Sequence, residues 1–94
     1  MVFAKQLRER ICRGEITRTV RIWQRCHVKV GGRYRMGDGR VVVTPVSPIS
    51  LQDITGSLAR QCGFNGTVDL LKVAQHGPGR NVFVIDFRYE NNRT

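Results

Sequence analysis

Side chains that can hold an anionic or aromatic ligand recur at every second position of one short segment: Thr17, Thr19, Arg21 and Trp23. Side chains of a β-strand alternate between two faces, so a strand here would place two hydroxyls, a guanidinium and an indole in one row. Such a row can bond a phosphate or a base edge and stack a ring, as in single-stranded RNA binding. The same spacing fits a second interpretation equally well, in which Trp23 lies in the core under a helix and Arg21 pairs with a carboxylate.

Three more arginines and a glycine flank this row. Arg13, Gly14 and Arg18 lie at its start, and Arg25 follows it. A guanidinium group pairs with phosphate through parallel hydrogen bonds, so these arginines are candidate phosphate ligands. A loop at Gly14 can also turn backbone N–H groups toward a phosphate. Because turns need glycine in any case and the chain has no P-loop or GxGxxG pattern, turn formation explains Gly14 better.

Soft metal ligands are few in this sequence. Cys26, His27, Cys62 and His76 match no zinc-binding spacing, and a free cysteine is commonly a buried core residue. Cys62 and His76 also form a conceivable nucleophile pair, on composition alone. The carboxylates are scattered, without a pairing suited to acid–base catalysis. We therefore expect no metal and no cofactor.

The charge balance favours a polyanionic partner. The 94 residues include 16 Lys+Arg against 7 Asp+Glu, for a net charge of +9. Residues 1–40 hold eleven basic and three acidic side chains, so this part alone carries +8. RNA or a nucleotide-like ligand is the partner that such an arginine-rich chain suits best. Two alternatives stay open: an acidic protein partner, and a basic surface that only keeps the protein soluble.

Chain length and cysteine usage limit the number of domains and the cellular compartment that we expect. A chain of 94 residues suffices for one domain, here residues 1–94, and we expect a monomer or a weak dimer. The three cysteines lack CxxC spacing and no signal-peptide pattern is visible, which favours reduced thiols in the cytoplasm. The longest aliphatic run covers only residues 41–43, so we expect no membrane span and no membrane partner.

Periodicity predicts the elements that position the row. Apolar residues at 3, 7 and 11 predict an amphipathic helix that ends at Gly14, and residues 17–24 have the pattern of a strand. Gly37-Asp38-Gly39 predicts a hairpin turn between strands at 33–36 and 40–46. Pro45 and Pro48 cannot donate backbone hydrogen bonds, so the second of these strands should lie at an edge or a barrel corner.

The rest of the chain predicts two helices and a last strand. A short helix at 55–61 begins with Thr55 as its N-cap and stops at Gly63. A further helix starts with Thr67 as its N-cap and is closed by His76-Gly77-Pro78, and a final strand covers residues 81–89. Residues 91–94 have the composition of a loose tail. The order αβ–ββ–αα–β predicts a small α+β domain, with helices at the rim of a small sheet or barrel.

The segment from Gly14 to Arg21 resembles the signature of the ASCH (activating signal cointegrator homology) family, Gly-x-Lys-x-x-Thr-x-Arg. The glycine, Thr19 and Arg21 match, whereas Ile16 stands in place of the lysine. Residues 30–34 resemble the family's second strand, 53–64 its helical insert and 82–89 its closing strand, so the resemblance covers most of the chain. It implies a PUA-like β-barrel with an N-terminal helix and a two-helix insert before the last strand. It also implies RNA binding in a cleft between barrel and helices, lined by the signature residues.

Some small ASCH proteins are amidohydrolases that act on N4-acetylcytidine, and others are ribonucleases. In the amidohydrolases the signature lysine and threonine act with a glutamate of the insert. Here only Thr19 remains, because the insert reads Arg60-Gln61-Cys62-Gly63 and has no carboxylate between Ile54 and Val68. An isoleucine at position 16 can neither polarise a carbonyl nor activate water.

Charge, strand pattern and resemblance together predict a binding module without catalytic activity, whose anionic ligand lies in a basic cleft beside the first strand. Thr19 would be the catalytic residue if the protein were an enzyme. A ribonuclease or a hydrolase of modified nucleosides with altered residues stays an alternative, and so does a protein–protein adaptor. The candidate ligand-binding residues are Arg13, Gly14, Arg18, Thr19, Arg21, Trp23 and Arg25.

Overall fold

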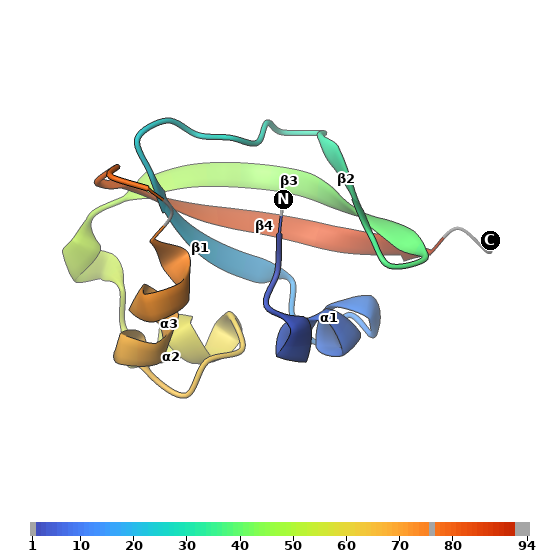
Figure 1. Ribbon diagram of the computed structural model, residues 1–94, viewed down its shortest axis with the longest axis horizontal. Helices are drawn as coiled ribbons and strands as arrows, with labels where there is room; N and C mark the ends of the chain where they lie inside the picture. Colours follow the sequence, from blue (N-terminus) through green and yellow to red (C-terminus); the bar gives the residue numbers. More distant parts are fainter. Residues whose placement is uncertain (1, 76, 92–94) are drawn as a thin grey trace.

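One curled antiparallel sheet with helices near its β1 edge organises the chain in a computed structural model, which describes residues 2–75 and 77–91 (Figure 1). The predicted order of elements is confirmed, with one added 3-10 turn. The elements are α1 (Lys5–Cys12), β1 (Arg18–Trp23), β2 (Arg33–Met36), β3 (Gly39–Ile49), η1 (Leu51–Asp53), α2 (Gly56–Gln61), α3 (Thr67–Ala74) and β4 (Asn81–Asn91). Asn91 therefore belongs to the last strand and not to a tail, and residues 92–94 lie outside the described part.

The four strands pair in the order β1-β4-β3-β2. The last strand thus lies inside the sheet, where it pairs antiparallel with both β1 and β3. A bulge between Val43 and Val46 bends β3 where it crosses β4. In this order β1 and β2 are the outer strands, and the curled sheet forms a half-barrel, which agrees with the predicted small barrel-like α+β fold.

The β2–β3 hairpin forms at the predicted turn, with Met36 opposite Gly39. β3 continues through both prolines to Ile49, beyond the predicted end at residue 46. Pairing between β2 and β3 runs only from residue 39 to residue 42, so one side of β3 is free of β2 by the time the prolines occur. This explains why the strand can contain Pro45 and Pro48, although β3 as a whole is an inner strand of the sheet: both prolines lie beyond the part of β3 that pairs with β2, and Pro45 falls at the bulge.

Local signals end the helices as predicted, with one correction. Gly14 and Gly63 take φ values of +78° and +92° just after α1 and α2. Thr55 caps α2, because its Oγ1 accepts the Leu58 N–H at 3.1 Å. Thr67 is not the N-cap of α3 as predicted. Gly66 takes the extended N-cap conformation instead, so the helix starts one residue earlier, and His76 of the predicted helix end lies outside the described residues.

The two faces of the sheet carry different side chains. Even-numbered residues of β4 face one way with Arg18, Arg40 and Ser47, and we call this side the Arg88 face. Odd-numbered residues of β4 face the other way, and we call that side the Phe87 face. Helices α2 and α3 cover one end of the Arg88 face, over Val20, Ile22, Val82 and Val84.

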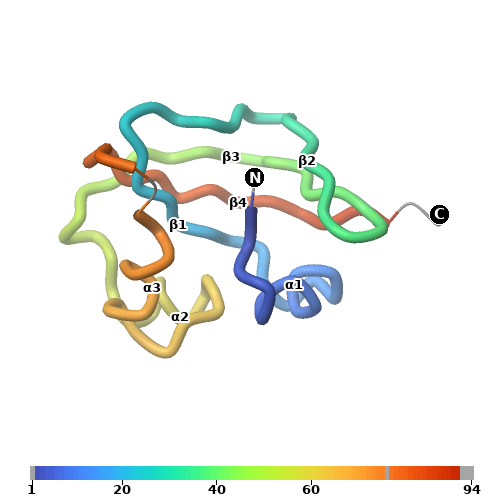
Figure 2. The backbone as a smooth tube through the Cα atoms, viewed as in Figure 1, coloured from blue at the N-terminus to red at the C-terminus, as the bar shows by residue number. Residues whose placement is uncertain are grey.

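The Phe87 face is covered by chain that comes from outside the sheet. The N-terminal segment brings Phe3 to within 5.3 Å of Phe87, measured between ring centroids, and α1 adds Leu7 and Ile11. Residues 24–32 run beside β3, where the Gly31 N–H donates to the Val43 carbonyl at 2.8 Å (Figures 1 and 2). This segment brings Val28 onto Trp23, Val43 and Ile85. Consequently β1 is buried on both of its faces.

Candidate nucleic-acid interface

The predicted alternation along β1 is confirmed, but its row of polar side chains is buried. Thr19 lies opposite Ile85, Arg21 opposite Phe83 and Trp23 opposite Asn81, all on the Phe87 face. Thr19, Arg21 and Trp23 are only 8%, 5% and 6% exposed. The side chains of this row therefore contact the segments that cover the sheet, and they face neither solvent nor an open cleft.

Arg21 keeps its charge inside the fold through nearby π and hydroxyl groups. Its guanidinium carbon lies 5.0 Å from the centroid of the Phe3 ring, and its Nε donates to Thr19 Oγ1 at 3.3 Å. Burial lowers the pKa of Arg21 to about 10. Arg21 thus contributes to the packing of the N-terminal segment on β1.

Trp23 has the surroundings of a core residue. Its ring meets His27 edge-on at a centroid distance of 4.8 Å and Phe83 at 6.1 Å. Val28 and Val43 complete the cluster. The segment that covers Trp23 is the loop after β1. The interpretation of Trp23 as a core residue had the first helix in this place.

The position at which the ASCH resemblance expects a lysine lies in tight apolar packing. Ile16 is 2% exposed. A Cβ added to Gly63 would lie 2.5 Å from Ile16 Cδ1 and 2.7 Å from Leu7 Cδ2, so α1, the segment before β1 and the insert approach closely here. Cys62 beside Gly63 is also buried, and its burial raises the pKa of the thiol to about 11.

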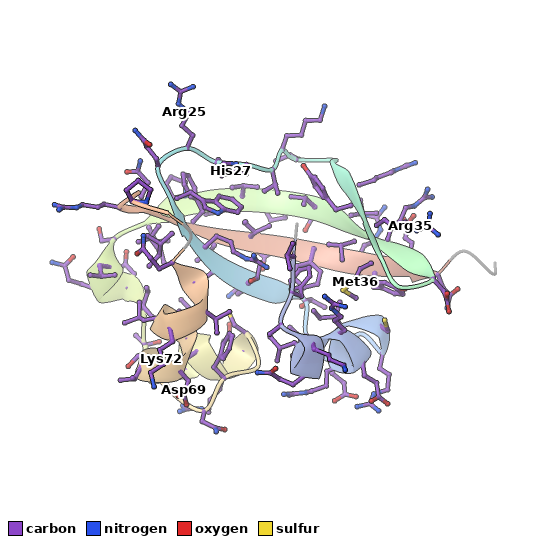
Figure 3. All side chains as sticks on the ribbon, in the orientation of Figure 1. Arg25, His27, Arg35, Met36, Asp69 and Lys72 are labelled. Atoms are coloured by element: carbon purple, nitrogen blue, oxygen red, sulfur yellow. The ribbon has the colours of Figure 1, made fainter. Side chains whose placement is uncertain are left out.

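Three other candidate residues lie in two separate exposed segments. Arg13, at the end of α1, pairs with Glu9 at 3.0 Å and with Glu15 at 2.5 Å. Gly14 is exposed and forms the turn after α1. Arg25 is exposed in the loop beyond β1 and points away from the fold (Figure 3). The structure thus does not gather the seven predicted residues into one site.

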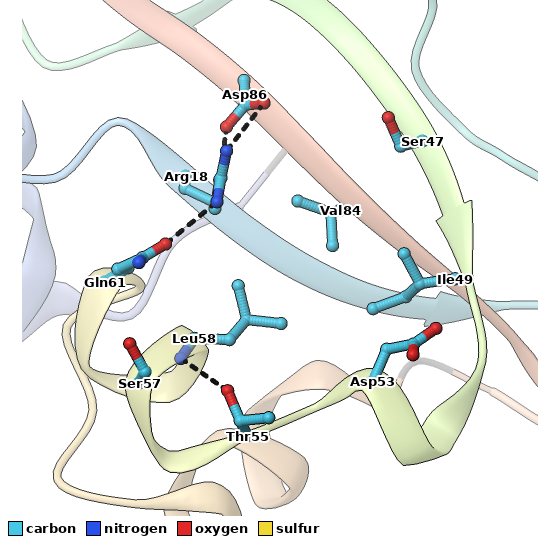
Figure 4. Close-up of a pocket in the computed structure, with 10 residues that line it drawn as sticks. All are labelled: Arg18, Ser47, Ile49, Asp53, Thr55, Ser57, Leu58, Gln61, Val84 and Asp86. Carbon is cyan, nitrogen blue, oxygen red and sulfur yellow. Dashed lines mark hydrogen bonds and ion pairs between the residues drawn. The ribbon is translucent and has the colours of Figure 1, made fainter.

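Arg18 is the predicted residue that reaches a cavity. It lies on the Arg88 face between β4 and α2, where its Nε and Nη2 donate to the two Asp86 oxygens at 2.6 and 3.3 Å (Figure 4). Its Nη1 donates to Gln61 Oε1 at 2.9 Å. The hydrogen bonds to Asp86 raise the pKa of Arg18, so this guanidinium stays charged and paired.

The cavity beside Arg18 has a volume of about 360 Å³ and opens between the sheet and the η1–α2 segment (Figure 4). We call it the Arg18 cleft. Its apolar lining consists of Ile49, Leu58 and Val84, and its polar lining of Arg18, Ser47, Asp53, Thr55, Ser57, Gln61 and Asp86. With one arginine against two carboxylates, the cleft itself does not favour an anionic group.

Farther along the Arg88 face lie four arginines that the candidate list missed. Arg35 lies opposite Arg40, and Val42 lies between Arg33 on β2 and Arg88 on β4. We call Arg33, Arg35, Arg40 and Arg88 the arginine strip. A hollow of about 290 Å³ is lined by three of them together with Gly39.

Among the described residues, one carboxylate pairs with the arginine strip. Glu90 binds Arg40 at 3.0 Å and Arg88 at 2.9 Å, and Arg33 and Arg35 form no ion pair within residues 2–75 and 77–91. Like charges directly opposite each other destabilise a sheet, so the Arg35–Arg40 pair does not serve stability. An anionic partner would relieve this repulsion. The sequence signal was present, because Arg33 and Arg35 alternate beside a hairpin turn that brings Arg40 opposite.

The cysteines offer no assembled metal or redox site in the described part of the chain. Cys12 and Cys26 are exposed, Cys62 is buried, and all three are free thiols. No group of three metal-ligating side chains occurs among the described residues. The predicted partner of Cys62, His76, lies outside them.

No family model, curated protein or solved structure matches the chain. None of the helices in the described residues is long and apolar enough to cross a membrane. The functional interpretation therefore rests on the geometry of the chain's own residues.

Proposed function

We propose that the protein is an RNA- or nucleotide-binding module of the ASCH type without catalytic activity, and that the arginine strip holds the phosphates of its ligand. One observation carries this proposal: the four arginines of the strip are neighbours on one sheet face, and within residues 2–75 and 77–91 their ion pairs are limited to those of Arg40 and Arg88 with Glu90. Guanidinium groups that a sheet presents at regular intervals suit the repeated phosphates of a nucleic acid.

The spacing of the strip supports a polyanion over a single small anion. Side chains two residues apart on a strand are separated by about 6.6 Å, and neighbouring strands by about 4.8 Å. Three strands contribute to the strip, with Arg33 and Arg35 on β2, Arg40 on β3 and Arg88 on β4. The charges are therefore distributed across the sheet, as successive phosphates of one strand require.

The order of elements supports the ASCH type. The Gly14–Arg21 segment follows an N-terminal helix and leads into β1, and a two-helix insert precedes the last strand, as the resemblance implies. The curled sheet is compatible with a PUA-like barrel of which four strands are present. Ile16 remains the main departure from the family pattern.

Local packing supports binding without catalysis. Ile16 is enclosed by Leu7 and Gly63, so that position offers neither a charge nor room for a water molecule. Cys62 is held as a neutral thiol by its burial. Thr19 is buried beneath Arg21 and the N-terminal segment, so its hydroxyl does not face a reaction cavity.

Anisotropy of a dye-labelled single-stranded RNA of mixed sequence tests the proposal. We expect log K to fall linearly with log [salt], with a slope of about −0.7 for each phosphate that is neutralised. Arg35→Gln should lower the affinity severalfold and reduce the slope by about 0.7. Arg13→Gln removes the same charge from an exposed site already paired with two glutamates, so it should change both quantities less.

Two results would contradict the binding part of the proposal. The first is RNA binding that ignores salt and the Arg35→Gln substitution. The second is co-purification of an acidic protein by the wild-type chain, lost in Arg35→Gln, without any RNA binding. Turnover of RNA or of acetylated cytidine that disappears in Thr19→Ala, with folding intact, would contradict the non-catalytic part.

A further inference from the structure

The arginine strip leads directly into the Arg18 cleft. Arg88 and Asp86 are two residues apart on the same face of β4, and Asp86 lines the cleft. A single nucleic-acid strand lying on the strip therefore reaches the mouth of the cleft within about one nucleotide. The two features differ in charge, because the strip is strongly basic and the cleft is not.

The cleft has the lining of a site for a flat, uncharged group. Ile49, Leu58 and Val84 form its apolar part, against which a ring can pack (Figure 4). Its volume of about 360 Å³ is at the small end of the range for ligand sites, which runs from about 300 to about 1,000 Å³. This size suits one heterocycle and its sugar.

The polar groups of the cleft are rich in acceptors. Asp53 uses Oδ2 to accept the Ser50 N–H at 2.8 Å, and its other oxygen accepts no hydrogen bond from the described residues. Asp86 binds Arg18 through both oxygens, and each carboxylate oxygen can accept a second hydrogen bond. Carboxylates repel phosphate and carbonyl oxygens, but they accept hydrogen bonds from amino groups.

We infer that the Arg18 cleft binds one base of an RNA strand whose phosphates lie on the arginine strip, and that it selects bases with an exocyclic amino group over uracil. The inference rests on the proposed function, since it assigns the base-reading part of that interface. Adenine, cytosine and guanine can donate an amino hydrogen to Asp53 or Asp86. Uracil presents two carbonyl oxygens and a single ring N–H to the same acceptors.

The test compares dye-labelled (C)n and (U)n strands of equal length at one salt concentration. The two carry equal charge and differ on one edge of the base, where cytosine has an amino group at position 4 and a bare N3, and uracil has a carbonyl at position 4 and a hydrogen on N3. We expect about fivefold tighter binding of (C)n, the effect of one hydrogen bond. Unlabelled (A)n should displace (C)n better than unlabelled (U)n does.

Two substitutions test whether the preference for (C)n arises in the cleft, and a third serves as their control. Ser57 is exposed at the start of α2 and lines the cleft, so Ser57→Phe should fill the cavity and abolish the preference for (C)n. Asp53→Asn keeps an oxygen for the Ser50 N–H but removes the negative charge, and it should weaken the preference. Val68→Phe adds the same ring at an exposed position of α3 outside the cleft and should leave the preference unchanged.

The outcomes separate the two proposals. Equal binding of (C)n and (U)n overturns the inference and leaves the proposed function standing. A preference that survives in Ser57→Phe also overturns it, because the base would then lie elsewhere. No salt-sensitive binding of either strand overturns the proposed function itself.

Discussion

At the scale of single residues, Arg21 shows how a candidate ligand residue can be a packing residue. Its guanidinium lies over Phe3 and beside Thr19, with 5% of the residue exposed. We expect Arg21→Ala to lower the free energy of unfolding by about 1–3 kcal/mol, through the lost cation–π contact and packing. Urea denaturation measures this loss. Arg25→Ala removes an exposed arginine near the other end of β1 and should stay within about 0.5 kcal/mol of the wild type.

Glu90 offers a substitution that strengthens binding. Hydrogen bonds from Arg88 and then Arg40 hold the pKa of this carboxyl below its usual range, so it is ionised at neutral pH and opposes a polyanion. Glu90→Gln should raise the affinity for RNA and steepen the salt slope by about 0.7. Glu9→Gln makes the same charge change on α1, where the carboxylate pairs with Arg13. Equal gains in RNA affinity from both substitutions would show that the affinity depends only on net charge. That result would contradict an RNA interface at the arginine strip.

The three thiols should differ in reactivity. Burial raises the pKa of Cys62 to about 11, and the thiolate is the reactive form. At pH 8 we expect iodoacetamide to modify exposed Cys12 and Cys26 rapidly and Cys62 only after unfolding. Mass spectrometry of the native and urea-treated protein distinguishes the sites. Rapid modification of Cys62 in the native protein would contradict the apolar packing around it.

At the scale of elements, the hairpin that carries three strip arginines depends on one close approach. A Cβ at Gly39 would overlap the Glu90 carbonyl oxygen and lie 2.6 Å from Tyr89 Oη, across the β3–β4 pair. We expect Gly39→Ala to cost about 3 kcal/mol of stability, because the rigid backbone of β4 cannot move away. Gly66→Ala meets nothing within 4 Å and should cost about 1 kcal/mol or less. Comparable thermal midpoints for the two variants would contradict this account.

Most elements could be predicted from sequence because their signals are local. The spacing of Leu7 and Ile11, the Thr55 cap and the Gly37-Asp38 turn each act within a few residues. The exposure of the β1 row could not be predicted in this way. Alternation assigns Thr19, Arg21 and Trp23 to one face, but residues distant along the chain decide whether that face is covered.

The candidate site was less predictable than the fold for the same reason. Arg33 and Arg35 reveal a shared face through their spacing, and the hairpin turn brings Arg40 opposite. The inclusion of Arg88 requires the pairing of β3 with β4, which are separated along the chain by α2 and α3. The Arg18 cleft likewise requires the position of α2 relative to the sheet, and no local pattern encodes that position.

At the scale of the whole molecule, the net charge of +9 on 94 residues sets how stability responds to ions. Self-repulsion among the arginines destabilises the compact state, and salt screens it. We expect the midpoint of thermal unfolding to rise between about 20 and about 200 mM NaCl. At constant salt, RNA at about 100 times Kd should add about 2.7 kcal/mol of stability. Differential scanning fluorimetry checks both expectations. A midpoint that falls with added salt would contradict the first, and a midpoint that RNA leaves unchanged would contradict the second.

The outer position of β2 gives its arginines a consequence beyond ligand binding. An outer strand presents unpaired backbone groups, which another copy of the chain can extend into a continuous sheet. β2 is only four residues long and carries Arg33 and Arg35 on an already basic face, so a second copy would meet strong repulsion on approach. The charges that attract a polyanion therefore also oppose self-association through the edge of the sheet. Removing several of them together should produce a chain that both binds RNA weakly and aggregates readily at low salt.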